Sequence, residues 1–155
     1  MKLNKEQLYK KKLPLGAYIS IIHRQHQIYL NKVASEKDIT AGQGLLLLHL
    51  LNVKTSSQNE IAENYRIDKG SIARSIRKLE DKGIVQREID DSNRKKYIVS
   101  LTEKGEEIAR YIKKSDEEWE KSVLRDLEIE EDSFIYGLKA MAFTSLELTC
   151  EEGEK

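Results

Sequence analysis

Residues 57–83 read SQNEIAENYRIDKGSIARSIRKLEDKG, and this stretch decides the fold. Ser57 followed three residues later by Glu60 is a helix-start signature, and Asp68 is the natural N-cap of a second helix. Gly83 tolerates the left-handed backbone conformation that commonly ends a helix. Two short capped helices separated by a turn of about four residues predict a helix-turn-helix.

Each of the two helices has an apolar and a polar side. The apolar residues recur at helical spacing and are expected to pack inward: Ile61, Ala62, Tyr65, Ile72, Ile76 and Leu79. The rest of the second helix carries four positive charges, on Arg74, Arg77, Lys78 and Lys82. Such a basic face raises the question of a negatively charged partner.

After Gly83 the apolar period changes from 3.6 residues to two. The segments IVQREID (84–90) and YIVSL (97–101) both alternate, which predicts two strands. The polar segment DDSNRKK between them favours a turn. A helix-turn-helix followed directly by a β-hairpin is a winged helix.

Helical patterns flank this unit on both sides. A long amphipathic helix is expected to begin near Pro14, and the TAGQ signature at 40–43 opens a strongly apolar helix. Helical spacing returns after residue 102, where Gly105 is mildly unfavourable in a first turn. The outer apolar stripes need a partner, and the nearest candidate is a second copy of the chain. We therefore expect an N-terminal dimerisation helix (14–36), a winged helix-turn-helix domain (39–102) and C-terminal dimerisation helices (103–150). The fold class is mainly α with a small β-hairpin wing.

Charge is unevenly distributed along the 155 residues. The chain has 27 basic and 27 acidic side chains. Residues 66–96 carry 10 basic and 6 acidic residues, whereas residues 97–155 carry 8 and 16. This pattern favours a local basic module on an acidic scaffold.

The sequence shows no targeting signal, and this bears on the cellular compartment that we expect for the protein. No apolar run reaches the length of a membrane span, and the N-terminus lacks the apolar region of a signal peptide. The single cysteine, Cys150, cannot form an internal disulfide, which fits a reducing compartment. We expect a cytoplasmic protein.

Four segments, in this order, resemble MarR-type winged-helix transcriptional regulators. They are LPLGAYISIIHRQHQIYL (13–30), DITAGQGLLLLHLL (38–51), the stretch from 56 to 90, and VSLTEKG (99–105). The resemblance covers about residues 14 to 148. It implies a homodimer that binds a pseudo-palindromic site on double-stranded DNA with one winged helix on each side. Repression is the family's commoner mode, and activation stays open.

The resemblance also implies roles for particular residues. Gly70, Ser71, Ala73 and Arg74 would lie where the recognition helix enters the major groove, with Arg74 suited to a bidentate guanine contact. The other expected DNA contacts, mainly to phosphates, are Ser57, Gln58, Lys69, Arg77, Lys78, Arg94 and Lys95.

Two positions depart from the family pattern. The family commonly places an Asp two residues before the wing arginine, and those positions here hold Asn93 and Lys95, with Arg94 between them. Either Arg94 or Lys95 could enter the minor groove. Related sequences often have Gly where this chain has Arg66, so either Arg66 is strained or Asn64 provides the left-handed cap.

Family members often bind small amphipathic or aromatic ligands that alter DNA affinity. The residues of this chain placed to line such a pocket are Tyr18, Ile22, His26 and Leu47, which could equally be core and interface residues. His23 and His26 have a spacing that can bind a metal, but no carboxylate or cysteine cluster accompanies them, so no metal or other cofactor is expected.

Neither an acid/base pair, a nucleophile with its base, nor a phosphate loop is present at interpretable spacing, so no enzyme is expected. The alternative function is a winged-helix dimer that serves as a protein-interaction scaffold, its basic face docking an acidic partner. Strong salt dependence of binding to duplex DNA would distinguish the two.

Overall fold

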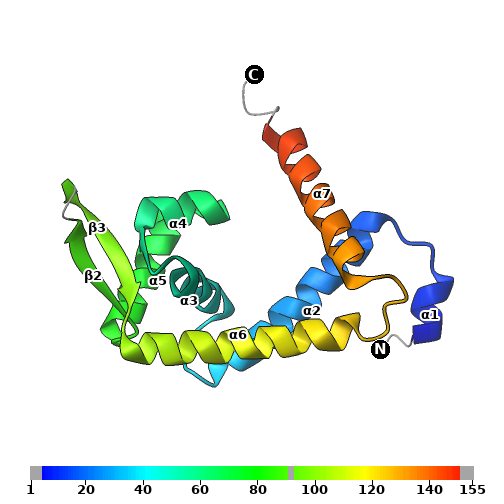
Figure 1. Ribbon diagram of the computed structural model, residues 1–155, viewed down its shortest axis with the longest axis horizontal. Helices are drawn as coiled ribbons and strands as arrows, with labels where there is room; N and C mark the ends of the chain where they lie inside the picture. Colours follow the sequence, from blue (N-terminus) through cyan, green and yellow to red (C-terminus); the bar gives the residue numbers. More distant parts are fainter. Residues whose placement is uncertain (1–4, 91–92, 151–155) are drawn as a thin grey trace. The chain divides into compact units, whose positions relative to one another are not determined.

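The computed structural model describes residues 5–90 and 93–150, without the side chains at 5–7, 90, 93–96 and 149–150. It is mainly helical with a small antiparallel sheet, which confirms the predicted fold class (Figure 1). The chain divides into two compact units, Met1–Asp116 and Glu117–Lys155. Within the described ranges, every helix is too short or too polar to span a membrane.

The elements follow in the order α1 (Lys5–Lys10), α2 (Leu15–Ser35), α3 (Ala41–Val53), β1 (Thr55–Ser57), α4 (Gln58–Tyr65), α5 (Lys69–Asp81), β2 (Val85–Asp90), β3 (Asn93–Leu101), α6 (Glu103–Leu124) and α7 (Glu131–Cys150). Neither α1 nor β1 was predicted. The β1 strand has only three residues and no apolar alternation, and it exists because β3 provides a partner.

The sheet has the strand order β1-β3-β2, with both pairs antiparallel. Ser56 of β1 and Arg87 of β2 both lie opposite Val99 of β3. The predicted hairpin is therefore present, and the wing (Val85–Leu101) is anchored at its base by a third strand. Figure 1 shows β2 and β3 extending beside α5.

Local capping signals set the helix starts as predicted. The Thr40 hydroxyl accepts from Gln43 N–H at 3.2 Å, while Gln43 Oε1 accepts from Thr40 N–H at 2.9 Å. Ser57 and Glu60 form the same reciprocal box at the start of α4. At the end of α4, Arg66 itself adopts the left-handed conformation with φ of 50°, so the alternative cap at Asn64 is wrong.

The hydrophobic core lies in the first unit and joins α2, α3, α4, α5, the sheet and α6. Its largest fully buried side chains are Leu47, Leu50, Ile61, Ile76, Leu79, Ile84, Val85, Val99 and Ile112. Tyr65 departs from the expectation of an inward side chain, since it is 40% exposed. It lies at the end of α4 and packs edge-on against His49 with ring centroids 5.5 Å apart.

Gly105 is required by a close approach that the sequence does not reveal. A Cβ at this position would lie 2.0 Å from the backbone oxygen of Ile84. The start of α6 therefore packs directly on the backbone that follows α5. Our expectation of a mildly unfavourable glycine was wrong, because contact between the two segments outweighs helix propensity here.

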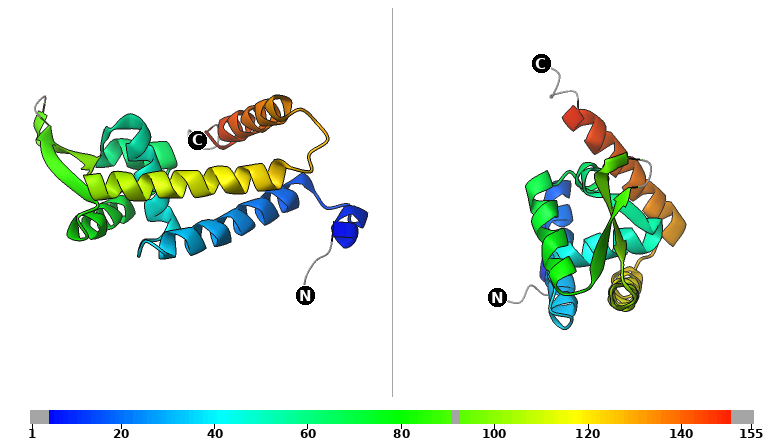
Figure 2. Two further views of the ribbon diagram at one scale, coloured as in Figure 1. Left: turned by 60° about the horizontal axis from the view of Figure 1, so that its bottom comes forward. Right: turned by 90° about the vertical axis from the view of Figure 1, so that its left-hand side faces the viewer.

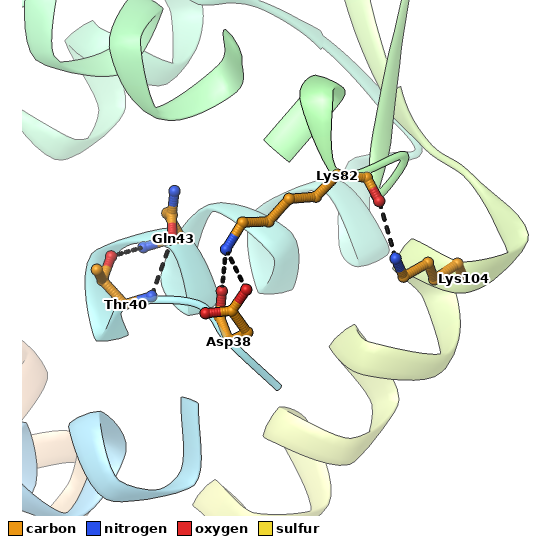
Figure 3. A network of polar contacts seen from close by, with 5 residues as sticks. All are labelled: Asp38, Thr40, Gln43, Lys82 and Lys104. Atoms are coloured by element: carbon orange, nitrogen blue, oxygen red, sulfur yellow. Dashed lines mark hydrogen bonds and ion pairs between the residues drawn. The ribbon is translucent and has the colours of Figure 1, made fainter. Parts of the chain in front are cut away.

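A polar network joins the loop after α2 to the end of α5 and the start of α6 (Figure 3). Lys82 Nζ donates to both the backbone oxygen and the carboxylate of Asp38, with 2.8 Å to the carboxylate. Lys104 Nζ donates to the Lys82 backbone oxygen at 2.8 Å. Three segments distant in sequence are thus connected at the C-terminal end of α5.

Because of the ion pair between Lys82 and Asp38, we expect the stability of the protein to depend on pH. The hydrogen bond from Lys82, and then its positive charge, lower the pKa of the Asp38 carboxyl below the usual value. Because the folded-state pKa is the lower one, the stabilisation is fully present above the unfolded-state pKa of about 3.9 and is lost as pH falls through the folded-state pKa. We expect Asp38→Asn to lower the free energy of unfolding at neutral pH, with the difference disappearing in acid.

Urea denaturation of both proteins across the acidic range would measure this. Asn suits the backbone at this position, where φ is 55°, so the variant changes charge and not conformation. A difference that stayed constant with pH would show that the carboxylate charge does not stabilise the contact.

Candidate nucleic-acid interface

The outer face of α5 collects most of the predicted DNA contacts. Ile72, Ile76 and Leu79 are buried on its inner side. On the outer side Lys69, Gly70, Arg74, Arg77 and Lys78 are exposed, while Ser71 and Ala73 are partly buried. The core thus fixes the rotation of α5 about its axis and directs its positive charges toward solvent.

The N-terminal end of α5 holds a chain of polar contacts with a spacing of three residues. Asp68 Oδ1 accepts from the Ser71 backbone N–H at 2.8 Å. Ser71 Oγ accepts from Arg74 Nη2, also at 2.8 Å. Hydrogen bonds from the side chain and then the backbone of Ser71 hold the pKa of Asp68 below its usual value, and the charge of Arg74 acts in the same direction.

Ser57 and Gln58 lie at the start of α4, as predicted, and both are partly buried. The Ser57 hydroxyl accepts from the Glu60 backbone N–H at 3.2 Å, and Ser57 N–H donates to Glu60 Oε2 at 2.7 Å. The Ser57 side chain is therefore already engaged in capping the helix.

An ion pair between Arg87 of β2 and Glu80 of α5 connects the wing to this helix. The hydrogen bond to Glu80 raises the pKa of the Arg87 guanidinium, which also lies 6.0 Å from the centroid of the Tyr97 ring. Arg94 and Lys95 belong to β3, but their side chains lie outside the described residues.

Comparison with known proteins identifies this arrangement. The MarR family model matches residues 39–97. A crystal structure of a MarR protein is 32% identical with a TM-score of 0.73, and the match covers 100% of both chains. A MarR transcriptional regulator from Methanosarcina mazei Go1 is also 32% identical, with a TM-score of 0.78 over 86% of this chain and 97% of that one.

The chain belongs to the MarR family. It is a winged-helix transcriptional regulator, as the sequence motifs indicated. The fold is also that of a mutant Escherichia coli MarR complexed with operator DNA, with a TM-score of 0.72 and 23% identity over 84% of this chain and 94% of that one.

The four residues predicted to line a ligand pocket of this MarR-family protein have different surroundings. Leu47 is fully buried in the core, whereas Ile22 is 55% exposed. The Tyr18 hydroxyl donates to the Lys11 backbone oxygen at 2.8 Å. His26 Nε2 lies 2.7 Å from Asp116 Oδ1, a contact between α2 and the part of α6 that belongs to the first unit; both helices can be followed in Figure 2.

No group of three or more His, Cys, Asp or Glu side chains that could hold a metal ion occurs within the part of the chain that the structure describes. Sequence reasoning missed two interface features, the partnership of Asp68 with Arg74 and the Glu80–Arg87 ion pair. The spacing of positions 68, 71 and 74 along one helix face could have indicated the link between Asp68 and Arg74. The Glu80–Arg87 ion pair joins a helix to a strand, and the local sequence of neither element indicates it.

Proposed function

We propose that this MarR-family regulator binds duplex operator DNA as a homodimer, with α5 in the major groove. The observation that carries the proposal is the division of α5, which has three core side chains on one side and exposed Arg74, Arg77 and Lys78 on the other. The major groove admits an α-helix, and a helix of this kind presents its basic face to the DNA. A mutant Escherichia coli MarR of the same fold is complexed with operator DNA, which supports DNA as the partner.

The interface residues take distinct roles in this proposal. Arg74 contacts a guanine, because its planar guanidinium can donate to two acceptors on one base edge. Arg77 and Lys78 contact phosphates and orient the helix. The wing brings Arg94 and Lys95 to the DNA as minor-groove or phosphate contacts, with one or the other entering the minor groove. The Glu80–Arg87 ion pair sets the direction of the wing relative to α5.

The proposed dimer rests on apolar side chains left exposed on two helices. In α7, Tyr136 is 76% exposed, Phe143 is 63% and Leu146 is 46%. In the first half of α2, Leu15 is 62% exposed and Ile19 is 47%. Large apolar groups repeated along a helix favour burial against a partner, and a second copy of the chain supplies an equivalent surface.

Substitution of Phe143 by Glu tests the dimer. A charge placed at a large buried interface residue leaves an unpaired ion in an apolar contact, so we expect the dimer dissociation constant to rise at least about a hundredfold. Sedimentation velocity over a range of protein concentrations measures this constant. Ser133→Glu adds the same charge at the exposed start of α7 and should leave it unchanged. Equal effects of both changes would contradict an interface at Phe143.

The regulator acts as a repressor in the cytoplasm, and a small amphipathic or aromatic ligand lowers its operator affinity. The position of His26 and Tyr18 on α2, a helix that contacts α6, supports a route from a ligand to the DNA-binding unit. A ligand that binds the free form more tightly than the DNA-bound form would release the operator.

Fluorescence anisotropy with a labelled duplex from upstream of the protein's own gene tests DNA binding. We expect saturable binding that greatly exceeds binding to a scrambled duplex and weakens steeply as salt increases. Absence of binding at low salt would overturn the proposal and favour an acidic protein partner for the basic face.

A further inference from the structure

The Arg74 guanidinium lies at the end of α5 where a positive charge is unfavourable. Long helical side chains lean toward the N-terminus, so Arg74 extends back over the first turn. The first turn carries the positive end of the helix dipole, which repels a cation. The Asp68 carboxylate at the N-cap supplies the opposite charge, and Ser71 connects the two side chains.

Asp68 holds the backbone of Ser71, and the Ser71 side chain holds Arg74. The Ser71 N–H donates to Asp68 Oδ1 at 2.8 Å, and Ser71 Oγ accepts from Arg74 Nη2 at 2.8 Å. The Ser71 side-chain oxygen is therefore already bonded to the guanidinium.

Gly70 leaves the space that this arrangement needs. A Cβ at position 70 would lie 3.2 Å from Asp68 Oδ1 and 3.4 Å from Arg74 Nη1. A Cβ there would be a tight contact for the Asp68 carboxylate oxygen and would reach van der Waals contact with the Arg74 nitrogen. Glycine at position 70 therefore leaves both charged groups room to lie over the first turn of α5.

We propose that Asp68 and Ser71 are positioning residues that hold the Arg74 guanidinium in one orientation for a guanine. Neither residue needs to contact a base, yet the sequence preference depends on both. An arginine without this restraint samples many rotamers, must be ordered when it binds, and can pair with phosphates of any sequence. The inference rests on the proposed function, in which α5 enters the major groove.

The test uses a short duplex that the wild-type protein selects from a randomised pool. Each guanine is replaced in turn by 7-deazaguanine, which lacks the N7 acceptor, and Kd is measured by anisotropy. We expect wild-type binding to weaken about tenfold at one position in each half-site. Arg74→Ala should weaken overall binding and show no further loss at that position.

Variants of Ser71 and Asp68 test the positioning roles directly. Ser71→Ala removes the link, and Asp68→Asn removes the charge while keeping a good N-cap. In both variants, replacing the contacted guanine by 7-deazaguanine should weaken binding by less than about threefold (the 7-deazaguanine effect). Ser71→Thr keeps a hydroxyl and should show the same loss of about tenfold as the wild-type protein. A merely structural role would change all affinities by one factor and leave this ratio unaltered. Circular dichroism checks that each variant is folded.

The outcomes separate the inference from the function. An undiminished 7-deazaguanine effect in Ser71→Ala, with loss of the effect in Arg74→Ala, overturns the positioning roles and leaves the proposed function intact. An undiminished effect in Arg74→Ala overturns both the guanine contact and its positioning. Failure of the wild-type protein to select any sequence overturns the proposed function itself.

Discussion

The double substitution Arg77→Glu and Lys78→Glu should weaken operator binding at least about a thousandfold at 0.1 M salt. Both residues are exposed on the outer face of α5, next to the buried Ile76 and Leu79. Each lost phosphate contact costs close to tenfold at this salt concentration, and a dimer loses about four of them. The reversed charges add repulsion. Anisotropy titrations should also show the slope of log Kd against log salt falling by about four.

A matched variant separates local contact from net charge. Lys113→Glu and Lys114→Glu change the charge of the chain by the same amount, at two exposed positions of α6. We expect a much smaller loss of affinity and nearly the original salt slope. Equal losses in the two double variants would show that only total charge matters, which would contradict a phosphate contact by α5.

Gly105→Ala should lower the free energy of unfolding by about 3 kcal/mol or more. The added Cβ would lie 2.0 Å from the Ile84 backbone oxygen and 3.1 Å from its carbonyl carbon, so backbone has to move. Movement of α6 would disturb the Thr102 hydroxyl, which donates to the Gly83 backbone oxygen at 2.8 Å. Urea denaturation followed by circular dichroism measures the change.

Gly42→Ala is the control for this prediction. Gly42 is also helical, but a Cβ there meets no atom within 4 Å. Because Ala is a better helix former than Gly, this variant should be neutral or more stable by up to about 1 kcal/mol. If both variants had the same stability, the contact between α6 and Ile84 would not be a packing constraint.

The helix-turn-helix was predictable because its signals are local. Ser57, Glu60 and Asp68 cap helices within three residues of themselves, and the structure forms those hydrogen bonds. The change of apolar period after Gly83 likewise predicted the hairpin. By contrast, β1 was missed because three residues without alternation become a strand only when β3 lies beside them.

The features of the candidate site that follow from local spacing were likewise predictable, and the others were not. Sequence alone determined that one helix would bear Arg74, Arg77 and Lys78 opposite an apolar stripe, since both faces arise from spacing within α5. The prediction of four pocket residues rested on the resemblance to a family. In the structure these residues have different surroundings, since Leu47 is buried in the core and Ile22 is exposed.

Only the tertiary structure decided how that helix is fixed in place. The Glu80–Arg87 ion pair joins α5 to the wing, Lys82 joins it to Asp38, and the Ile84 backbone requires glycine at position 105. Each contact links elements whose relative positions depend on how the whole core packs. Local periodicity records which face of an element is apolar, but it carries no information on which distant residue will lie against it.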